Sequence, residues 1–281
     1  MTQDNGKPSR VRRFDPTRGL HQQGRVFQLS YTAEQCEDLL KCLEVMVQKT
    51  IDCAPRRASG YALTRPNLAR HEREEHRLER AICQAWRPDG RLYGTDFSTS
   101  CNTIPFFQVR IQAPRRRELN AGWGRVDLVG VSKVDNFPVP IELKKGEAND
   151  TLLRVVVEIA AYALAMRAGW SGLRNDWTTA IQGLAPAGGV PDEWKRCQLV
   201  CAAPQSFWDR KLGFNGERDR MPRNAWEPFV RVLNAFKGYG LTFEFVSVEV
   251  DRNHDAELPI IVSAKPVPLL EFASYLSSPS H

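Results

Sequence analysis

The spacing of apolar positions divides the first part of the chain into two helices and a loop. Leucine and valine recur at near-helical intervals over residues 32–49, and the stretch from Thr32 to Gln35 resembles a capping box, so a helix is predicted there. Residues 53–67 are rich in proline, arginine and glycine, which favours a loop. A second, highly charged helix with a narrow apolar stripe is predicted over residues 68–86.

The apolar period then changes to that of extended chain. Residues 103–113, 125–132 and 138–145 are rich in β-branched and aromatic side chains, and each segment is predicted to be a strand. The connections between them are short, which indicates an antiparallel meander. Residues 151–167 form a helix that is apolar nearly all round, so it should be buried on more than one side. A fourth strand is expected at 196–203, after this helical crossover.

The remaining segments complete an α/β pattern. A helix is predicted at 226–237 and a strand at 241–250, whereas 168–195 is irregular. Helix, three strands, helix and strand in this order predict a mixed central sheet flanked by helices, with an N-terminal helical extension. The expected domains are a flexible basic arm (1–27), the helical extension (28–67), the core with insertions (68–252) and a weakly patterned C-terminal tail (253–281).

Composition narrows the class of protein. The chain has 281 residues, and 39 Lys and Arg against 33 Asp and Glu give a net charge of +6, a balance compatible with a polyanionic partner. No apolar run approaches the roughly 20 residues needed to span a bilayer, and the N-terminus lacks the apolar region of a secretory signal. The seven cysteines form no CxxC pair, which argues against a zinc site. We therefore expect a cytoplasmic protein with reduced thiols and no membrane partner.

The stretch IELKK at residues 141–145 carries the candidate chemistry. On a strand, Glu142 and Lys144 share one face. An antiparallel neighbour would bring Asp127 within about 5 Å of Glu142. Two carboxylates that close repel each other unless they share a cation or one of them is protonated. Carboxylates, a backbone carbonyl and waters are the ligands that magnesium favours, so a Mg²⁺ or Mn²⁺ site is one interpretation and an ordinary ion pair on an edge strand is the other.

Two helices carry further acids that could face this site. Arg154, Glu158 and Tyr162 lie four residues apart on the apolar helix and form its one polar stripe. The stripe either supports the site or consists of polar side chains that reach water, with Arg154 paired to Glu158. On the charged helix, Glu75 is in line with the apolar stripe and Glu79 borders it, so either could point inward or stay solvated.

Together these residues resemble the PD-(D/E)XK nuclease superfamily. The resemblance rests on Asp127 followed by Glu142-Leu143-Lys144, and the family core of helix, three-strand meander, helix and strand matches the predicted order over residues 68–203. Glu158 and Tyr162 resemble the Gln-x-x-x-Tyr motif of the lambda exonuclease-like branch, with glutamate in place of glutamine. Val126 stands where the motif of the superfamily often has proline.

The resemblance implies a site and a role for each of its members. Its catalytic residues would be Asp127, Glu142, Lys144, Glu158 and Tyr162. Its metal ligands would be Asp127, Glu142, the Leu143 carbonyl and Glu79, with Glu75 as the alternative to Glu79. Lys144 would assist the attacking water, and Glu158 and Tyr162 would support the site or contact the substrate backbone.

The expected function is therefore metal-dependent hydrolysis of phosphodiester bonds, with DNA as the expected substrate, in repair, restriction or defence. Nucleic-acid contacts are expected from Arg115, Arg116, Arg117, Arg154, Arg210 and Lys211. Three alternatives stay open: an inactive nuclease-fold protein that binds nucleic acid or assembles a complex, an enzyme of unrelated chemistry, and an exposed turn at the three consecutive arginines. The sequence also leaves open a homo-oligomer or a protein partner.

Overall fold

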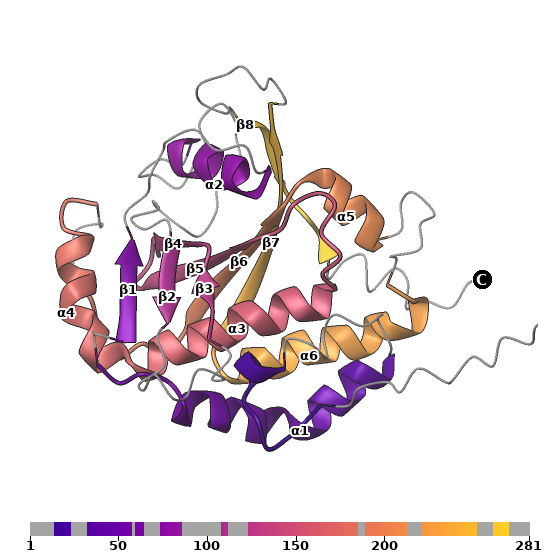
Figure 1. Cartoon of the computed structure of the whole chain (residues 1–281), viewed down its shortest axis with the longest axis horizontal. Coiled ribbons are helices and arrows are strands. Elements are labelled where there is room, and N and C mark those ends of the chain that lie inside the picture. Colours follow the sequence, from indigo (N-terminus) through magenta and orange to yellow (C-terminus); the bar gives the residue numbers. More distant parts are fainter. Residues whose placement is uncertain are drawn as a thin grey trace, which may run out of the picture.

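The architecture is a mixed β-sheet with helices on both faces, as the computed structural model of the chain shows (Figure 1). The structure describes residues 14–23, 33–57, 60–64, 74–85, 108–111, 123–184, 189–212, 221–251 and 261–269. The predicted α/β class with a mixed central sheet is confirmed. None of the helices in these ranges is long and apolar enough to cross a bilayer.

Five strands form the central sheet. In spatial order they are β4 (Leu128–Val131), β5 (Pro138–Leu143), β6 (Cys197–Ala203), β7 (Leu241–Val250) and β8 (Ile261–Pro266). The two outer pairs, β4 with β5 and β7 with β8, are antiparallel, whereas β5, β6 and β7 are parallel to one another. The predicted crossover from the third strand through a helix to a parallel fourth strand is therefore present. The carboxyl ends of β5, β6 and β7 lie at the same edge of the sheet.

The predicted meander is divided between two sheets. β1 (Tyr61–Thr64), β2 (Gln108–Ile111) and β3 (Arg125–Val126) form a small antiparallel sheet, and β4 begins two residues after β3 ends. The strand predicted over 125–132 is thus interrupted at Asp127, where the chain passes from one sheet to the other. The prediction of a loop over 53–67 is wrong for β1, a four-residue edge strand whose ladder bonds all go to β2.

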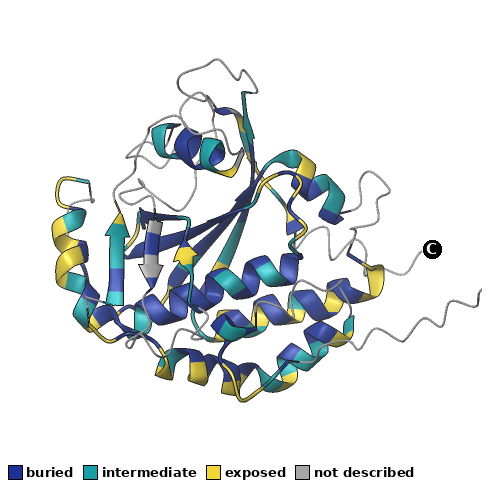
Figure 2. Cartoon of the chain, viewed as in Figure 1, coloured by how far each residue is buried: buried dark blue, intermediate teal, exposed yellow. Residues whose placement is uncertain are grey.

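Helices cover the two faces of the central sheet unequally (Figure 1). α3 (Leu152–Ala168) and α6 (Trp226–Gly238) pack on one face, and α1 (Ala33–Asp52) lies across both as an outer layer. α3 is buried along almost its whole length because it lies between the sheet and α1 (Figure 2). Thr151 caps the start of α3 by accepting a hydrogen bond from the Arg154 N–H at 3.1 Å.

The opposite face is covered by α2 (Glu74–Ala85), which falls within the predicted charged helix; residues 68–73 and 86 lie outside the described ranges. Its apolar stripe, which includes Leu78 and Ile82, packs on Ile141 and Leu143 of β5. Because side chains alternate along a strand, Glu142 points to the α3 face of the sheet. The carboxyl end of β5 therefore lies between the charged helix α2 on one face of the sheet and the polar stripe of α3 on the other.

Two further helices occur where the sequence pattern was weak. α4 (Trp170–Ala180) lies in the segment expected to be irregular, although Trp170, Leu173 and Trp177 are buried and have helical spacing. α5 (Gln205–Leu212) follows β6 directly. The expected weakly patterned tail contains β8, which exists because its backbone pairs with β7.

The expected loose arm is partly ordered. Residues 14–23, with a short 3₁₀ helix at Leu20–Gln22, pack against α1 and α3. Leu20 is only 2% exposed, and its N–H donates to the Thr50 hydroxyl at 2.8 Å. The prediction of a flexible arm over 1–27 is wrong for this segment because Phe14 and Leu20 bury apolar side chains. Residues 1–13 and 24–27 lie outside the described ranges.

A glycine between α3 and α4 supplies a test of the fold. A Cβ at Gly169 would lie 2.2 Å from the Tyr61 hydroxyl and 2.4 Å from the Pro55 carbonyl oxygen. We expect Gly169→Ala to lower the free energy of unfolding by about 1–3 kcal/mol, the usual cost of overpacking. Gly238→Ala, where no atom lies within 4 Å of the added carbon, is the matched control. Urea unfolding measures both, and equal free energies for the two variants would contradict the packing described.

Candidate active site

Asp127 marks the strand break and is tied to β5 through its side chain. Leu128 pairs with Ile141, so extending this register by one residue places Asp127 opposite Glu142, as the sequence predicted. The Asp127 Oδ2 accepts a hydrogen bond from the Leu143 N–H at 2.8 Å. A side-chain oxygen therefore supplies the acceptor that a continuous strand would have supplied from its backbone. Since the N–H and C=O of a strand residue point the same way, the Leu143 carbonyl also faces this side.

Glu142 and Lys144 share a face at the carboxyl end of β5, as expected from their spacing. Glu142 is only 3% exposed, and its Oε1 lies 2.5 Å from the Lys144 ammonium. The same ammonium lies 3.4 Å from Glu158 Oε2 and 3.9 Å from Asp150 Oδ2. Lys144 is thus the centre of a group of carboxylates contributed by β5, by α3 and by the loop between them.

The polar stripe of α3 faces this group. The Tyr162 hydroxyl donates to Glu158 Oε1 at 3.4 Å. The Arg154 guanidinium lies 2.8 Å from Asp150 and 3.6 Å from Glu158, so its shorter ion pair is with a residue that the sequence reading had not included in the site. Asp150 precedes Arg154 by four residues, and this spacing was the available signal.

A close approach of backbone fixes the Tyr162 side chain. A Cβ at Gly124 would lie 2.4 Å from the Tyr162 hydroxyl oxygen, so only glycine leaves room for it there. Gly124 directly precedes β3 and lies three residues before Asp127. The chain entering the strand break thus passes directly beside the polar stripe of α3.

α2 brings acids to the same place from the other face. Glu75, Glu79 and Asp127 each offer a carboxylate oxygen, and these oxygens lie within 4.8 Å of one another. Glu79 is only 1% exposed and Glu75 is exposed, so both candidates of the first core helix reach Asp127. The His76 Nδ1 lies 2.7 Å from Glu79 Oε2 and can orient that carboxylate.

Burial shifts the protonation of these acids. Burial raises the pKa of Glu79 to about 8, and the nearby Glu75 carboxylate adds to the rise. Burial likewise raises the pKa of Asp127 to about 7, although Lys144 and the Leu143 N–H oppose the shift. The pKa of Glu142 is raised well above its usual value by burial and by Asp127. Burial alone would lower the pKa of Lys144, but the surrounding carboxylates outweigh it and raise that pKa well above its ordinary value.

One carboxylate oxygen of Glu142 indicates that a bound cation could offset the negative charges at this site. Glu142 Oε2 is buried and has no hydrogen-bond partner among the described residues. A buried acceptor without a partner costs about 1–3 kcal/mol, and a divalent cation would satisfy it. The atoms that could coordinate such a cation are all oxygens, which suits Mg²⁺ or Mn²⁺ rather than a metal that prefers sulfur or nitrogen. Asp127, Glu142, Glu79, Glu75 and the Leu143 carbonyl are the groups that could hold it.

The residues expected to contact nucleic acid lie in different parts of the molecule. Arg115, Arg116 and Arg117 lie outside the described ranges. Arg154 lies beside the acidic group, where its guanidinium is ion-paired. The Arg210 guanidinium donates to the carbonyls of Gly146 and Ala148 at 2.5 and 3.0 Å, which holds the loop between β5 and α3.

Lys211 does not fit the role predicted for it. It is only 1% exposed, and its ammonium lies 5.6 Å from the centre of the Phe207 ring. The period of α5 places Phe207, Lys211 and Leu212 on the buried face of that helix. The prediction for Lys211 was wrong because this residue lies on the buried face of α5, a helix that the sequence pattern did not predict.

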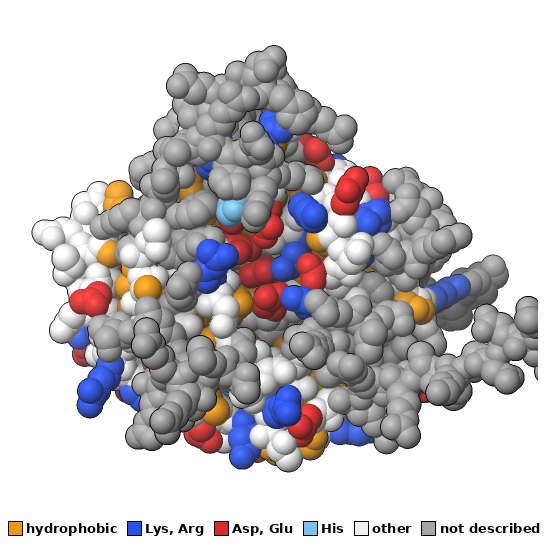
Figure 3. Space-filling view, in the orientation of Figure 1, with side chains coloured by type: hydrophobic (Ala, Val, Ile, Leu, Met, Phe, Trp, Pro, Cys, Tyr) orange, Lys and Arg blue, Asp and Glu red, His pale blue; other side chains and the backbone are white. Residues whose placement is uncertain are grey.

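Figure 3 shows the acidic side chains gathered near the middle of one face of the molecule, with lysine and arginine side chains beside them. Anionic groups that share a cation, bordered by fixed positive charges, could receive a phosphate group. In comparisons with known proteins, no family model, no curated protein and no solved structure matched the chain. The chemistry of the site therefore rests on its own geometry.

The raised pKa values predict a pH-dependent response to magnesium. Between about pH 4 and pH 8 the folded protein retains protons on Asp127 and Glu79 that the unfolded chain has released. The stability that these bound protons contribute is therefore lost as the pH rises through the folded pKa values of about 7 and 8. Mg²⁺ binds the ionised carboxylates, so it should raise the melting temperature more at about pH 8 than at about pH 6.

Thermal unfolding with magnesium or with EDTA at the two pH values measures this response. Glu79→Gln is the test variant, because it removes one ionisable ligand. It should reduce both the magnesium-induced rise in melting temperature and the pH dependence of that rise. Equal shifts at the two pH values, or no shift with magnesium in the wild-type protein, would contradict a cation site at these carboxylates.

Proposed function

We propose that this protein is a magnesium-dependent nuclease that hydrolyses phosphodiester bonds, with DNA as its substrate. The observation that carries the proposal is the convergence of Asp127, Glu142 and Lys144 at one strand end, around a buried carboxylate oxygen that lacks a partner. The same three residues carry the resemblance to the PD-(D/E)XK superfamily. Glu158 and Tyr162 of α3 complete the arrangement.

Each side chain has a chemical role in this proposal. A bound divalent cation supplies a lowered pKa for an attacking water and offsets the negative charge of the phosphate. Asp127 and Glu142 are the anionic groups that attract the cation, and the Asp127 bond to the Leu143 N–H fixes its carboxylate in place. Lys144 could donate hydrogen bonds to the attacking water or to a phosphate oxygen. Glu158 keeps the ammonium charged and oriented.

Electrostatics favour an enzyme over a module that only binds nucleic acid. Several carboxylates beside a polyanion repel it, so a binding module gains nothing from burying Glu142 next to Asp127. A cation shared by these groups removes the repulsion and also supplies the chemistry. A protein that neither binds Mn²⁺ nor cleaves nucleic acid would instead support the inactive nuclease-fold module.

Substitution of the central residues tests the proposal. Lys144→Met and Asp127→Asn should each lower the magnesium-dependent cleavage rate by about 100-fold or more, in the range for loss of a positioned catalytic group. Lys145→Met is the matched control, because Lys145 is exposed and adjacent in sequence and should keep nearly wild-type activity. Circular dichroism shows whether each variant is folded.

The choice of substrates sharpens the same assay. Linear duplex, circular duplex, single-stranded DNA and RNA are incubated with the protein and magnesium or manganese. Cleavage of circles would identify an endonuclease, and degradation of linear forms alone an exonuclease. Cleavage that survives both Lys144→Met and Asp127→Asn would show that the site proposed here is not responsible.

A further inference from the structure

Two neighbouring cavities lie at the opposite end of the central strands. One, of about 420 Å³, lies between α6, the first half of β7 and residues 266–269. The other, of about 500 Å³, lies beside the turn between β4 and β5 and the start of β6. Lys237 and Thr242 line both, so the two cavities meet there. Each has the volume of a small-molecule site, for which about 300–1,000 Å³ is typical.

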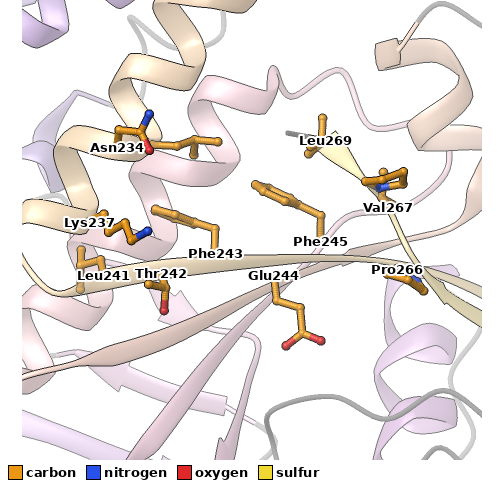
Figure 4. Close-up of a pocket in the computed structure, with 12 residues that line it drawn as sticks. Asn234, Lys237, Leu241, Thr242, Phe243, Glu244, Phe245, Pro266, Val267 and Leu269 are labelled. Atoms are coloured by element: carbon orange, nitrogen blue, oxygen red, sulfur yellow. The ribbon is translucent and has the colours of Figure 1, made fainter. Parts of the chain in front are cut away.

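The first cavity presents flat aromatic surfaces. The Phe243 and Phe245 rings are nearly parallel, with an angle of 13° between their planes and 6.3 Å between their centres. Figure 4 shows both rings on the side of β7 that faces α6, whereas Glu244 between them points to the other side of the strand. Phe245 is buried and Phe243 half-buried, so the pair offers an accessible ring in an apolar setting closed by Leu233 and Leu269.

Positive charge lies where the cavities meet. Lys237 projects from α6 beside the Phe243 ring in Figure 4, and it has no ion-pair partner among the described residues. Arg196 lines the second cavity, is exposed and likewise has no ion-pair partner in the described ranges. The second cavity also contains Asp135, whose carboxylate accepts the Phe137 N–H at 3.4 Å. The lining of the two cavities thus holds two cations, Lys237 and Arg196, and two acids, Asp135 and Glu244, of which Glu244 points away from the Phe243 and Phe245 rings.

The two cavities together therefore match a ligand with a flat ring at one end and an anion at the other. We propose that they form a binding site for a nucleoside monophosphate. The base stacks on the Phe243 ring in the apolar cavity, as bases stack on aromatic side chains elsewhere. The phosphate lies at the junction, where Lys237 and Arg196 attract it, and the amide of Asn234 on α6 can hydrogen-bond the base or the sugar.

This site is separate from the acidic group. β5 runs from Pro138, which lines the second cavity, to Leu143, which is tied to Asp127. Five residue steps at about 3.3 Å each place the two sites roughly 17 Å apart along the strand. Nucleotide binding there needs no cation and does not depend on the proposed nuclease activity.

Isothermal titration calorimetry with AMP as the probe, in EDTA, tests the proposal. EDTA removes divalent cations, so the acidic group at the other end of β5 repels the phosphate and does not contribute. Phe243→Leu and Lys237→Met should each weaken AMP binding by about fivefold or more, because one removes the stacking ring and the other the charge. Lys49→Met, which changes an exposed lysine on α1, should leave the affinity unchanged.

Two further titrations separate the parts of the ligand. Adenosine should bind more weakly than AMP because it lacks the phosphate, and inorganic phosphate should bind more weakly than AMP because it lacks the ring. The proposal is overturned if AMP gives no binding at millimolar concentration, if both cavity variants bind it like the wild type, or if adenosine binds as tightly as AMP.

Discussion

The burial of Glu142 is the constraint on which the rest of the site depends. A carboxylate enclosed at a strand end is costly unless a positive charge or a hydrogen-bond donor faces each oxygen. Lys144 satisfies one oxygen at 2.5 Å, and the other has no hydrogen-bond partner among the described residues. Asp127 and Glu158 add negative charge around the same lysine. The Arg154 guanidinium pairs with Asp150 and Glu158 at the margin of this group, so Lys144 is the cation that contacts Glu142, and a divalent cation would offset the remaining negative charge.

The fold supplies these groups from both faces of the sheet. The strand break at Asp127 lets its side chain reach the Leu143 N–H, which a continuous strand would have paired through its backbone. α2 delivers Glu79 from one face and α3 delivers Glu158 from the other. The long burial of α3 fixes its one polar stripe against the end of β5, so the apolar core determines where the charges meet.

Patterns that depend on local geometry were predictable from the sequence. Alternation on β5 placed Glu142 and Lys144 on one face, and four-residue spacing placed Glu158 and Tyr162 on one side of α3. Features that depend on a distant partner were not predictable. β1 and β8 exist through their pairing with other strands, and Lys211 is buried because of what α5 packs against. Whether a basic side chain such as that of Lys211 lies on the buried or the exposed face of its helix therefore cannot be predicted until the packing of that helix is known.

Crystallography with Mn²⁺ tests the cation site most directly, because manganese gives an anomalous signal that identifies its position. We predict a peak at about 2.0–2.3 Å from an Asp127 oxygen and from Glu142 Oε2. Glu79 should supply a further oxygen or bind a coordinated water. A saturated crystal with no peak among these carboxylates, or with manganese bound elsewhere only, would contradict the cation site.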